Sequence, residues 1–64
     1  MAKITESHSY GKSTIRTGFA DAAAALAWVE AAQGIVQAEE DADYPGYYDI
    51  FTKHGRVLAI EPEA

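Results

Sequence analysis

The sequence contains no cysteine, so this 64-residue chain can form neither a disulfide, nor a thiolate nucleophile, nor a zinc–sulfur site. It has no run approaching the ~18 apolar residues that a membrane-spanning helix needs, and its first residues, MAKITESHSYGKS, contain no apolar signal segment. We therefore expect a soluble, cytoplasmic protein without a membrane partner. The length predicts a single domain, residues 1–64, with little room for a deep substrate pocket.

Basic residues are missing from the middle of the chain. No Lys or Arg occurs between Thr17 and Thr52, whereas seven Asp or Glu residues lie in that interval, and the whole chain has a net charge of −5. A nucleic-acid-binding surface needs clustered Lys and Arg side chains that neutralise phosphates. The charge distribution therefore argues against direct binding of DNA or RNA.

The clearest structural signal is one helix within ADAAAALAWVEAAQG, residues 20–34. Alanine has the highest helix propensity, Asp21 can cap the first turn, and Gly34 is a natural terminator. The helical repeat places Leu26 and Val29 on one inner face. The opposite face carries only small uncharged side chains: Ala23, Ala24, Ala27 and Ala31. That face either reflects helix propensity alone or offers a surface to a partner.

Turn-forming residues divide the rest of the chain into short strands. The first two strands are expected to join at a Gly11-Lys12 turn, and the last two at His54-Gly55. Between the helix and a turn at Pro45-Gly46, the segment IVQAEE predicts one more strand. The resulting order is β-β-α-β-β-β. It predicts an α+β fold in which one helix packs on one face of a small antiparallel sheet.

The pairing of the last two strands decides which side chains are expected in the core. A two-residue turn at His54-Gly55 would place Phe51 opposite Leu58, so that both share one face with Ile60. Trp28 is expected to be partly covered. The predicted core residues are Ile4, Ile15, Phe19, Leu26, Val29, Ile35, Phe51, Leu58 and Ile60.

None of the motif-like stretches carries a full set of catalytic or ligating residues. YGKST resembles the end of a phosphate-binding loop, but Glu6 stands where that loop needs its first glycine. DADYPGYYD partly matches a calcium loop, but Pro45 and Thr52 replace two of the ligands. His8 and His54 lack the nucleophile and oxyanion patterns that accompany catalytic histidines. We therefore expect no enzymatic activity, no cofactor and no tight metal site.

One stretch, QAEEDADYPGYYDIF at residues 37–51, combines five carboxylates and three tyrosines with no Lys or Arg. Tyrosines offer rigid, amphipathic contact area, and carboxylates pair with the Lys or Arg of a partner. The stretch is therefore either a solvated loop that keeps the protein soluble or a binding surface for a basic protein. The predicted partner-binding residues are Glu39, Glu40, Asp41, Asp43, Tyr44, Tyr47, Tyr48 and Asp49.

The piece EEDADYPGYYDIF, in a small acidic α+β chain, resembles the surfaces of phage-borne anti-CRISPR proteins and other nucleic-acid-mimic inhibitors. The resemblance implies a non-enzymatic inhibitor. Such a protein would bind a basic groove of a nucleic-acid-handling protein, such as a CRISPR effector subunit, and block nucleic-acid access. The basic residues that flank the acidic interval favour a local plug over mimicry of a whole duplex.

A second interpretation belongs to a different class of protein. The chain would then be a small accessory or structural module that docks through its alanine-rich helix face, as a monomer or a weak homodimer. Salt distinguishes the two interpretations, because an interface between acids and bases weakens as ionic strength rises, whereas an alanine interface responds little.

Overall fold

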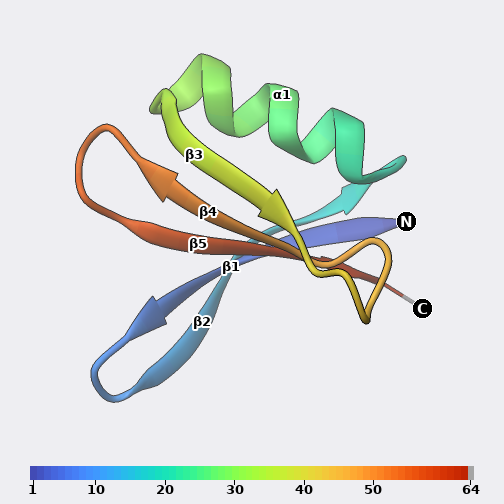
Figure 1. Cartoon of the computed structure of the whole chain (residues 1–64), viewed down its shortest axis with the longest axis horizontal. Coiled ribbons are helices and arrows are strands. Elements are labelled where there is room, and N and C mark those ends of the chain that lie inside the picture. Colours follow the sequence, from blue (N-terminus) through green and yellow to red (C-terminus); the bar gives the residue numbers. More distant parts are fainter. Residues whose placement is uncertain (64) are drawn as a thin grey trace.

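The computed structural model describes residues 1–63, which form a five-stranded antiparallel sheet with one helix on one of its faces (Figure 1). The elements are β1 (Ala2–His8), β2 (Gly11–Phe19), α1 (Ala22–Ala32), β3 (Ile35–Glu40), β4 (Tyr48–Thr52) and β5 (Val57–Pro62). The strands lie in the order β2-β1-β5-β4-β3, so β2 and β3 form the two edges. The predicted α+β class and element order are confirmed.

The helix has the ends that the sequence predicts. The Asp21 side chain caps α1 by accepting a hydrogen bond from the Ala24 backbone N–H at 2.8 Å. Gly34 follows the helix with φ +80°, a left-handed conformation that favours glycine. Ala25 and Val29 are buried against the sheet. The four alanines of the opposite face are exposed: Ala23, Ala24, Ala27 and Ala31. No helix within residues 1–63 is both long enough and apolar enough to cross a bilayer.

The core lies between α1 and the middle strands of the sheet. Its buried apolar residues are Ala2, Ile4, Ala25, Val29, Ile50, Leu58 and Ile60. Phe19, Leu26, Trp28 and Ile35 are half-buried around this cluster, which agrees with most of the predicted core. Two predicted core residues are wrong, since Ile15 is 38% exposed and Phe51 is 47% exposed.

The position of Phe51 follows from the turn that joins β4 to β5. Thr52 N–H donates to the Arg56 carbonyl at 3.0 Å, and Gly55 has φ +79°. Three residues therefore form the turn, one more than the predicted two, and its last residue takes the left-handed conformation. The extra residue shifts the pairing by one position, so that Phe51 pairs with Val57 and Ile50 with Leu58. A shift of one residue moves every side chain to the other face, which buries Ile50 and exposes Phe51.

The first hairpin also differs from the prediction. His8 pairs with Gly11, so Ser9 and Tyr10 form the turn, and the predicted Gly11-Lys12 turn is wrong. The register then slips further along β2, where Thr14 pairs with Thr5 but Arg16 pairs with Ile4. Ile15 is the extra residue of this bulge, and an extra bulge residue leaves the regular alternation of faces. The bulge therefore explains why Ile15 is not part of the core.

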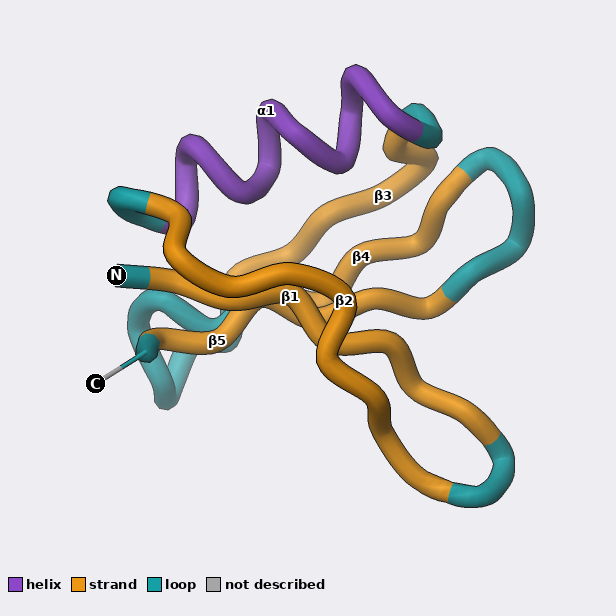
Figure 2. The backbone as a smooth tube through the Cα atoms, turned by 180° about the vertical axis from the view of Figure 1, so that it is seen from behind, coloured by secondary structure: helices purple, strands orange, loops and turns teal. Residues whose placement is uncertain are grey.

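The sheet has one face without a helix, which we call the open face. Ile4, Ile50, Leu58 and Ile60 point toward α1, so their neighbours along each strand point the other way. Residues on the open face include Thr5, Glu39, Asp49, Phe51, Val57, Ala59 and Glu61. The view from behind in Figure 2 shows that the β1–β2 hairpin extends away from α1, so the helix covers only part of the opposite face.

Candidate partner-binding site

The acidic residues of the predicted site lie where β3 ends and β4 begins. Glu39 pairs directly with Asp49, and Glu40 pairs with Tyr48. Because side chains alternate along a strand, Glu39 and Asp49 share the open face, whereas Glu40 and Tyr48 lie on the helix side. Like charges directly opposite each other destabilise a sheet. The Glu39–Asp49 pair is therefore a place where a cation from another molecule would be favourable.

The loop between β3 and β4 is held by its own carboxylates. Asp41 N–H donates to the Tyr47 carbonyl at 2.8 Å and closes the loop. The Asp41 side chain accepts from the Asp43 backbone N–H at 2.8 Å, and the Glu40 side chain accepts from the Gly46 N–H at 3.0 Å. Asp and Glu oxygens that satisfy backbone donors in this way order a turn. Glu40 and Asp41 therefore shape the loop as well as carrying charge.

Four of the predicted carboxylates surround one surface hollow of about 260 Å³, which we call the acidic hollow. Its lining residues are Glu39, Glu40, Asp41, Ala42 and Asp49. All five are exposed. Within the described part of the chain, no Lys or Arg lines the acidic hollow, so its negative charge is not neutralised locally. A concave, acidic and solvent-accessible surface favours a cationic group of a partner.

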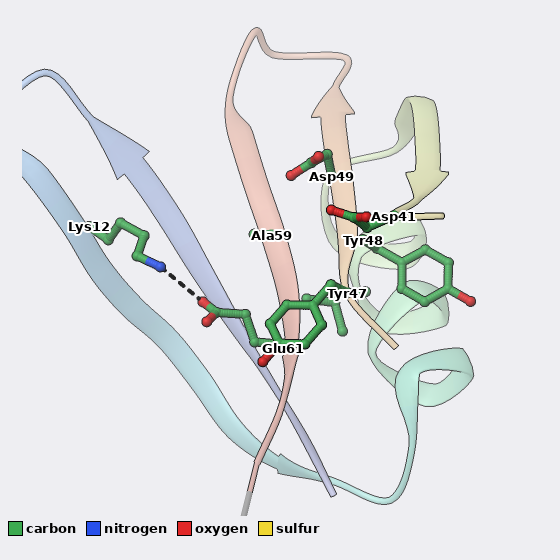
Figure 3. A pocket seen from close by; sticks show the side chains of 8 residues that line it. Lys12, Asp41, Tyr47, Tyr48, Asp49, Ala59 and Glu61 are labelled. Carbon is green, nitrogen blue, oxygen red and sulfur yellow. Dashed lines mark hydrogen bonds and ion pairs between the residues drawn. The ribbon is translucent and has the colours of Figure 1, made fainter. Parts of the chain in front are cut away.

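A second hollow of about 210 Å³ adjoins the first and shares Asp41 and Asp49 with it. We call it the tyrosine hollow, because the Tyr47 ring stands at its rim (Figure 3). In this view the Asp41 and Asp49 carboxylates point toward the same side as Glu61, whereas the Tyr48 ring points away. Its lining residues are Lys12, Asp41, Tyr47, Tyr48, Asp49, Ala59, Ile60 and Glu61.

The floor of the tyrosine hollow is fixed by an internal network around Glu61. The Glu61 carboxylate accepts from Thr5 Oγ1 at 3.0 Å, and its Oε2 lies 3.4 Å from Lys12 Nζ. Burial alone would raise the pKa of the Glu61 carboxyl. The hydrogen bonds from Thr5 and Lys12, with the positive charges of Lys12 and Lys3, outweigh burial and lower this pKa below its ordinary value. Glu61 thus forms an ion pair with Lys12, whereas no ion pair within residues 1–63 involves Asp49.

The structure brings together only part of the predicted site. The two hollows bring together Glu39, Asp41, Asp49 and Tyr47. Tyr44 is 62% exposed and packs edge-on against Tyr47, with the ring centroids 5.9 Å apart. Glu40 also lines the acidic hollow, whereas the other two predicted residues lie differently. Tyr48 is half-buried and packs against the core cluster, and Asp43 lines neither hollow.

Two residues at the tyrosine hollow were not anticipated from the sequence. Lys12 and Glu61 lie far apart in the chain and far from the acidic stretch, and only the order β2-β1-β5-β4 brings them beside it. Because neighbouring strand residues point to opposite faces, the apolar Ile60 beside Glu61 indicates that Glu61 faces away from the core. The sequence could therefore have placed Glu61 on the open face. Nothing in the local sequence indicates that Lys12 reaches across β1 to meet it.

His8 lies beside a serine and a glutamate, in an arrangement that differs from a catalytic triad. His8 Nε2 lies 2.9 Å from Ser13 Oγ and 3.9 Å from Glu6 Oε1. In a catalytic triad the serine and the acid bind different ring nitrogens, whereas here both lie closest to Nε2. Within residues 1–63, no group of three or more His, Cys, Asp or Glu side chains is placed to hold a metal ion. Comparison with family models, with curated proteins and with solved structures finds no match to this chain.

Proposed function

We propose that this chain is a non-enzymatic inhibitor whose acidic hollow binds a basic groove of a nucleic-acid-handling protein, such as a CRISPR effector subunit. By occupying that groove it would block the access of nucleic acid. The observation that carries the proposal is the convergence of four exposed carboxylates on one hollow that no Lys or Arg of residues 1–63 lines. The partner is a basic protein surface, not DNA or RNA, because the site repels phosphate.

Electrostatics favours a cationic guest at this hollow. Glu39 and Asp49 are directly opposite in register, so each raises the free energy of the other in its charged form. A guanidinium or ammonium group between them would remove that repulsion and form charge-assisted hydrogen bonds. Tyr47, at the rim of the adjoining tyrosine hollow, adds an aromatic face, which attracts Arg side chains and gives contact area at little entropic cost.

The proposed mechanism of inhibition needs no chemistry. Proteins that hold nucleic acid do so largely through Lys and Arg contacts to phosphates, and effectors read short motifs with a few of these residues. Carboxylates held on a strand pair and a closed loop can occupy such cations. The chain is at most 27 Å across, so it would cover a few of these contacts as a local plug.

The experiment that tests the proposal compares two variants of equal charge. The site variant carries Glu39→Gln and Asp49→Asn, which remove two charges from the acidic hollow with little change in shape. The control variant carries Asp21→Asn and Glu30→Gln at the two ends of the helix. Asp21 caps Ala24, and Glu30 accepts from the Ile35 N–H, and each amide keeps an oxygen that can accept these bonds.

Wild type and both variants are immobilised and exposed to a bacterial lysate at about 0.05 M and about 0.5 M salt, where screening differs strongly. We expect wild type and the control variant to retain the same basic nucleic-acid-handling protein at low salt. High salt and the site variant should each abolish this retention. If the site variant retains the same proteins as wild type, the carboxylates serve solubility and the proposal is wrong.

The second candidate function is docking through the helix, and it depends on the exposure of Ala23, Ala24, Ala27 and Ala31. An Ala27→Glu variant would place a charge at the centre of that face. Retention of a partner that survives high salt but is lost in Ala27→Glu would favour the accessory-module function over the inhibitor.

A further inference from the structure

The free edge of β3 is exposed along most of its length. This strand is one of the two edges of the sheet and pairs only with β4 (Figure 1). Residues 36–40 are all exposed, and Val36 is 68% exposed. Neither the helix nor a loop of residues 1–63 therefore covers this edge. An exposed edge presents backbone N–H and C=O groups that can pair with another strand.

The ladder between β3 and β4 shows which backbone groups point outward. Asp41 N–H donates to the Tyr47 carbonyl, so these two residues form a hydrogen-bonded pair. Hydrogen-bonded and non-hydrogen-bonded pairs alternate along an antiparallel ladder. Ala38 and Glu40 therefore belong to the non-hydrogen-bonded pairs, and their N–H and C=O groups point away from β4. No side chain of residues 1–63 accepts a hydrogen bond from either N–H group.

The two edges of the sheet differ in charge and regularity. The edge strand β2 contains a bulge and carries Lys12 and Arg16, and bulges and basic side chains both protect an edge against pairing. The other edge, β3, carries Glu39 and Glu40 and no base. Like charges on neighbouring strands repel, so β3 disfavours an acidic strand and favours one that brings Lys or Arg. The edge of β3 is thus the one suited to a basic partner.

The side chains of β3 indicate the order of residues on such a strand. The Glu39 carboxylate takes part in no ion pair within residues 1–63, whereas the Glu40 carboxylate already accepts from the Gly46 N–H. Val36 offers an apolar side chain nearer the start of the strand. On an antiparallel partner strand, the residue opposite Glu39 precedes the residue beside Val36 by three positions. Opposite charges and apolar pairs across strands both stabilise pairing.

We propose that the edge of β3 binds an extended segment of the basic partner as one more antiparallel strand. In that segment a Lys or Arg opposite Glu39 is followed three residues later by an apolar residue beside Val36. The main chain of the segment bonds to the outward groups of Ala38 and Glu40, as in other cases of strand addition. The inference rests on the proposed function for the charge of the partner. It adds how the partner is held, beside the acidic hollow that Glu39 also lines.

Amide hydrogen exchange, followed by NMR, tests this proposal at single residues. The probe is an end-blocked synthetic peptide, Thr-Arg-Thr-Thr-Val-Thr, and the control peptide has Glu in place of Arg. At an excess of the Arg peptide, exchange at the N–H groups of Ala38 and Glu40 should slow at least about tenfold, because both groups become hydrogen-bonded. Exchange at Glu39, whose N–H already faces β4, should change little. The Glu peptide should protect neither edge amide, because it brings like charge to Glu39.

Two variants at one position test the role of the outward N–H. Ala38→Pro removes this donor, and proline is tolerated on an edge strand where the N–H faces solvent. It should weaken binding of the Arg peptide at least about tenfold, because the peptide loses a donor and meets the proline ring instead. Ala38→Ser keeps the N–H and should bind the peptide as wild type does. Circular dichroism checks the fold of both variants, and if Ala38→Pro does not fold, the exchange pattern of wild type decides.

Three outcomes would overturn the proposal. One is unchanged exchange at Ala38 and Glu40 with excess Arg peptide. Another is equal protection by the Glu peptide. The third is slow exchange at both amides in a concentrated solution of the chain alone, which would identify a second copy as the occupant of the edge.

Failure of this proposal and failure of the proposed function give different results. Ala38→Pro keeps every carboxylate of the acidic hollow. If it retains the same basic protein as wild type, the hollow acts without strand pairing, and the strand-addition proposal alone is wrong. If the Arg peptide protects the edge but Glu39→Gln/Asp49→Asn retains the basic protein as wild type does, the inhibitor proposal alone is wrong.

Discussion

Two neighbouring residues of β4 give the sharpest test of the fold, because they lie on opposite faces of the sheet. Ile50 is fully buried, and Phe51 is 47% exposed. Replacing a buried Ile by Ala removes its burial and leaves a cavity, at a cost of about 2–5 kcal/mol. Phe51→Ala gives up only part of the side-chain burial of a phenylalanine, which amounts to about 1 kcal/mol. Ile50→Ala is therefore expected to lower the free energy of unfolding more than Phe51→Ala, although isoleucine is the smaller side chain.

Thermal unfolding followed by circular dichroism distinguishes these values, because 1 kcal/mol shifts the Tm of a domain of this size by about 4–8 °C. We expect Ile50→Ala to lower Tm by at least about 10 °C or to unfold the chain, and Phe51→Ala to lower it by less than that. Both variants are measured at low concentration, where self-association does not contribute. If Phe51→Ala is as destabilising as Ile50→Ala, the three-residue turn and the register that follows from it are wrong.

Three further predictions concern single residues. Asp21→Ala should cost about 1 kcal/mol in the free energy of unfolding, and Asp21→Asn should cost little, since Asn caps helices equally well; urea titration measures both. Gly34→Ala should cost more than about 1 kcal/mol, because Gly34 has φ +80° and the added Cβ would meet Lys53 at 2.7 Å. The pKa of Glu61 is lowered in the folded chain, so the stability it contributes is present above its ordinary pKa and lost as pH falls. Wild type should therefore lose more stability than Glu61→Gln between about pH 6 and pH 3, and equal losses would contradict the Thr5–Lys12–Glu61 network.

The helix and the order of the elements could be predicted because their signals are local. Asp21 and Gly34 specify the two ends of α1 through the backbone conformations they favour, and the alanines between them favour the helix. These signals do not depend on what the helix packs against. The structure confirms both ends and the exposed alanine face.

The faces of the strands could not be predicted as well, because they depend on turns and bulges. The turn before Arg56 has one residue more than predicted, and the shifted register buries Ile50 in the core and leaves Phe51 exposed, the reverse of the prediction. The bulge at Ile15 removed another residue from the expected core. Glycine at either position of a short turn is compatible with both turn lengths, so the sequence alone did not decide between them.

The composition of the candidate site was visible in the sequence, but its geometry was not. The acidic stretch identifies the carboxylates of the site. The register of β3 and β4 places Glu39 opposite Asp49, and Tyr48 packs against the core. The contribution of Lys12 and Glu61 depends on contacts between strands that are distant in sequence. Such contacts have no local signal, and they required the structure.

We propose that the acidic hollow displaces nucleic acid from a basic groove, and a competition measurement tests this most directly. The basic protein retained by the wild type is saturated with a fluorescently labelled nucleic acid that it binds, and anisotropy is followed as this chain is added. Wild type and the Asp21→Asn/Glu30→Gln control should release the labelled strand with equal potency. The Glu39→Gln/Asp49→Asn variant should release it at least about tenfold less effectively, because it lacks the charges that compete with phosphate. Equal potency of all three proteins, or binding of wild type without release of the strand, would contradict the claim.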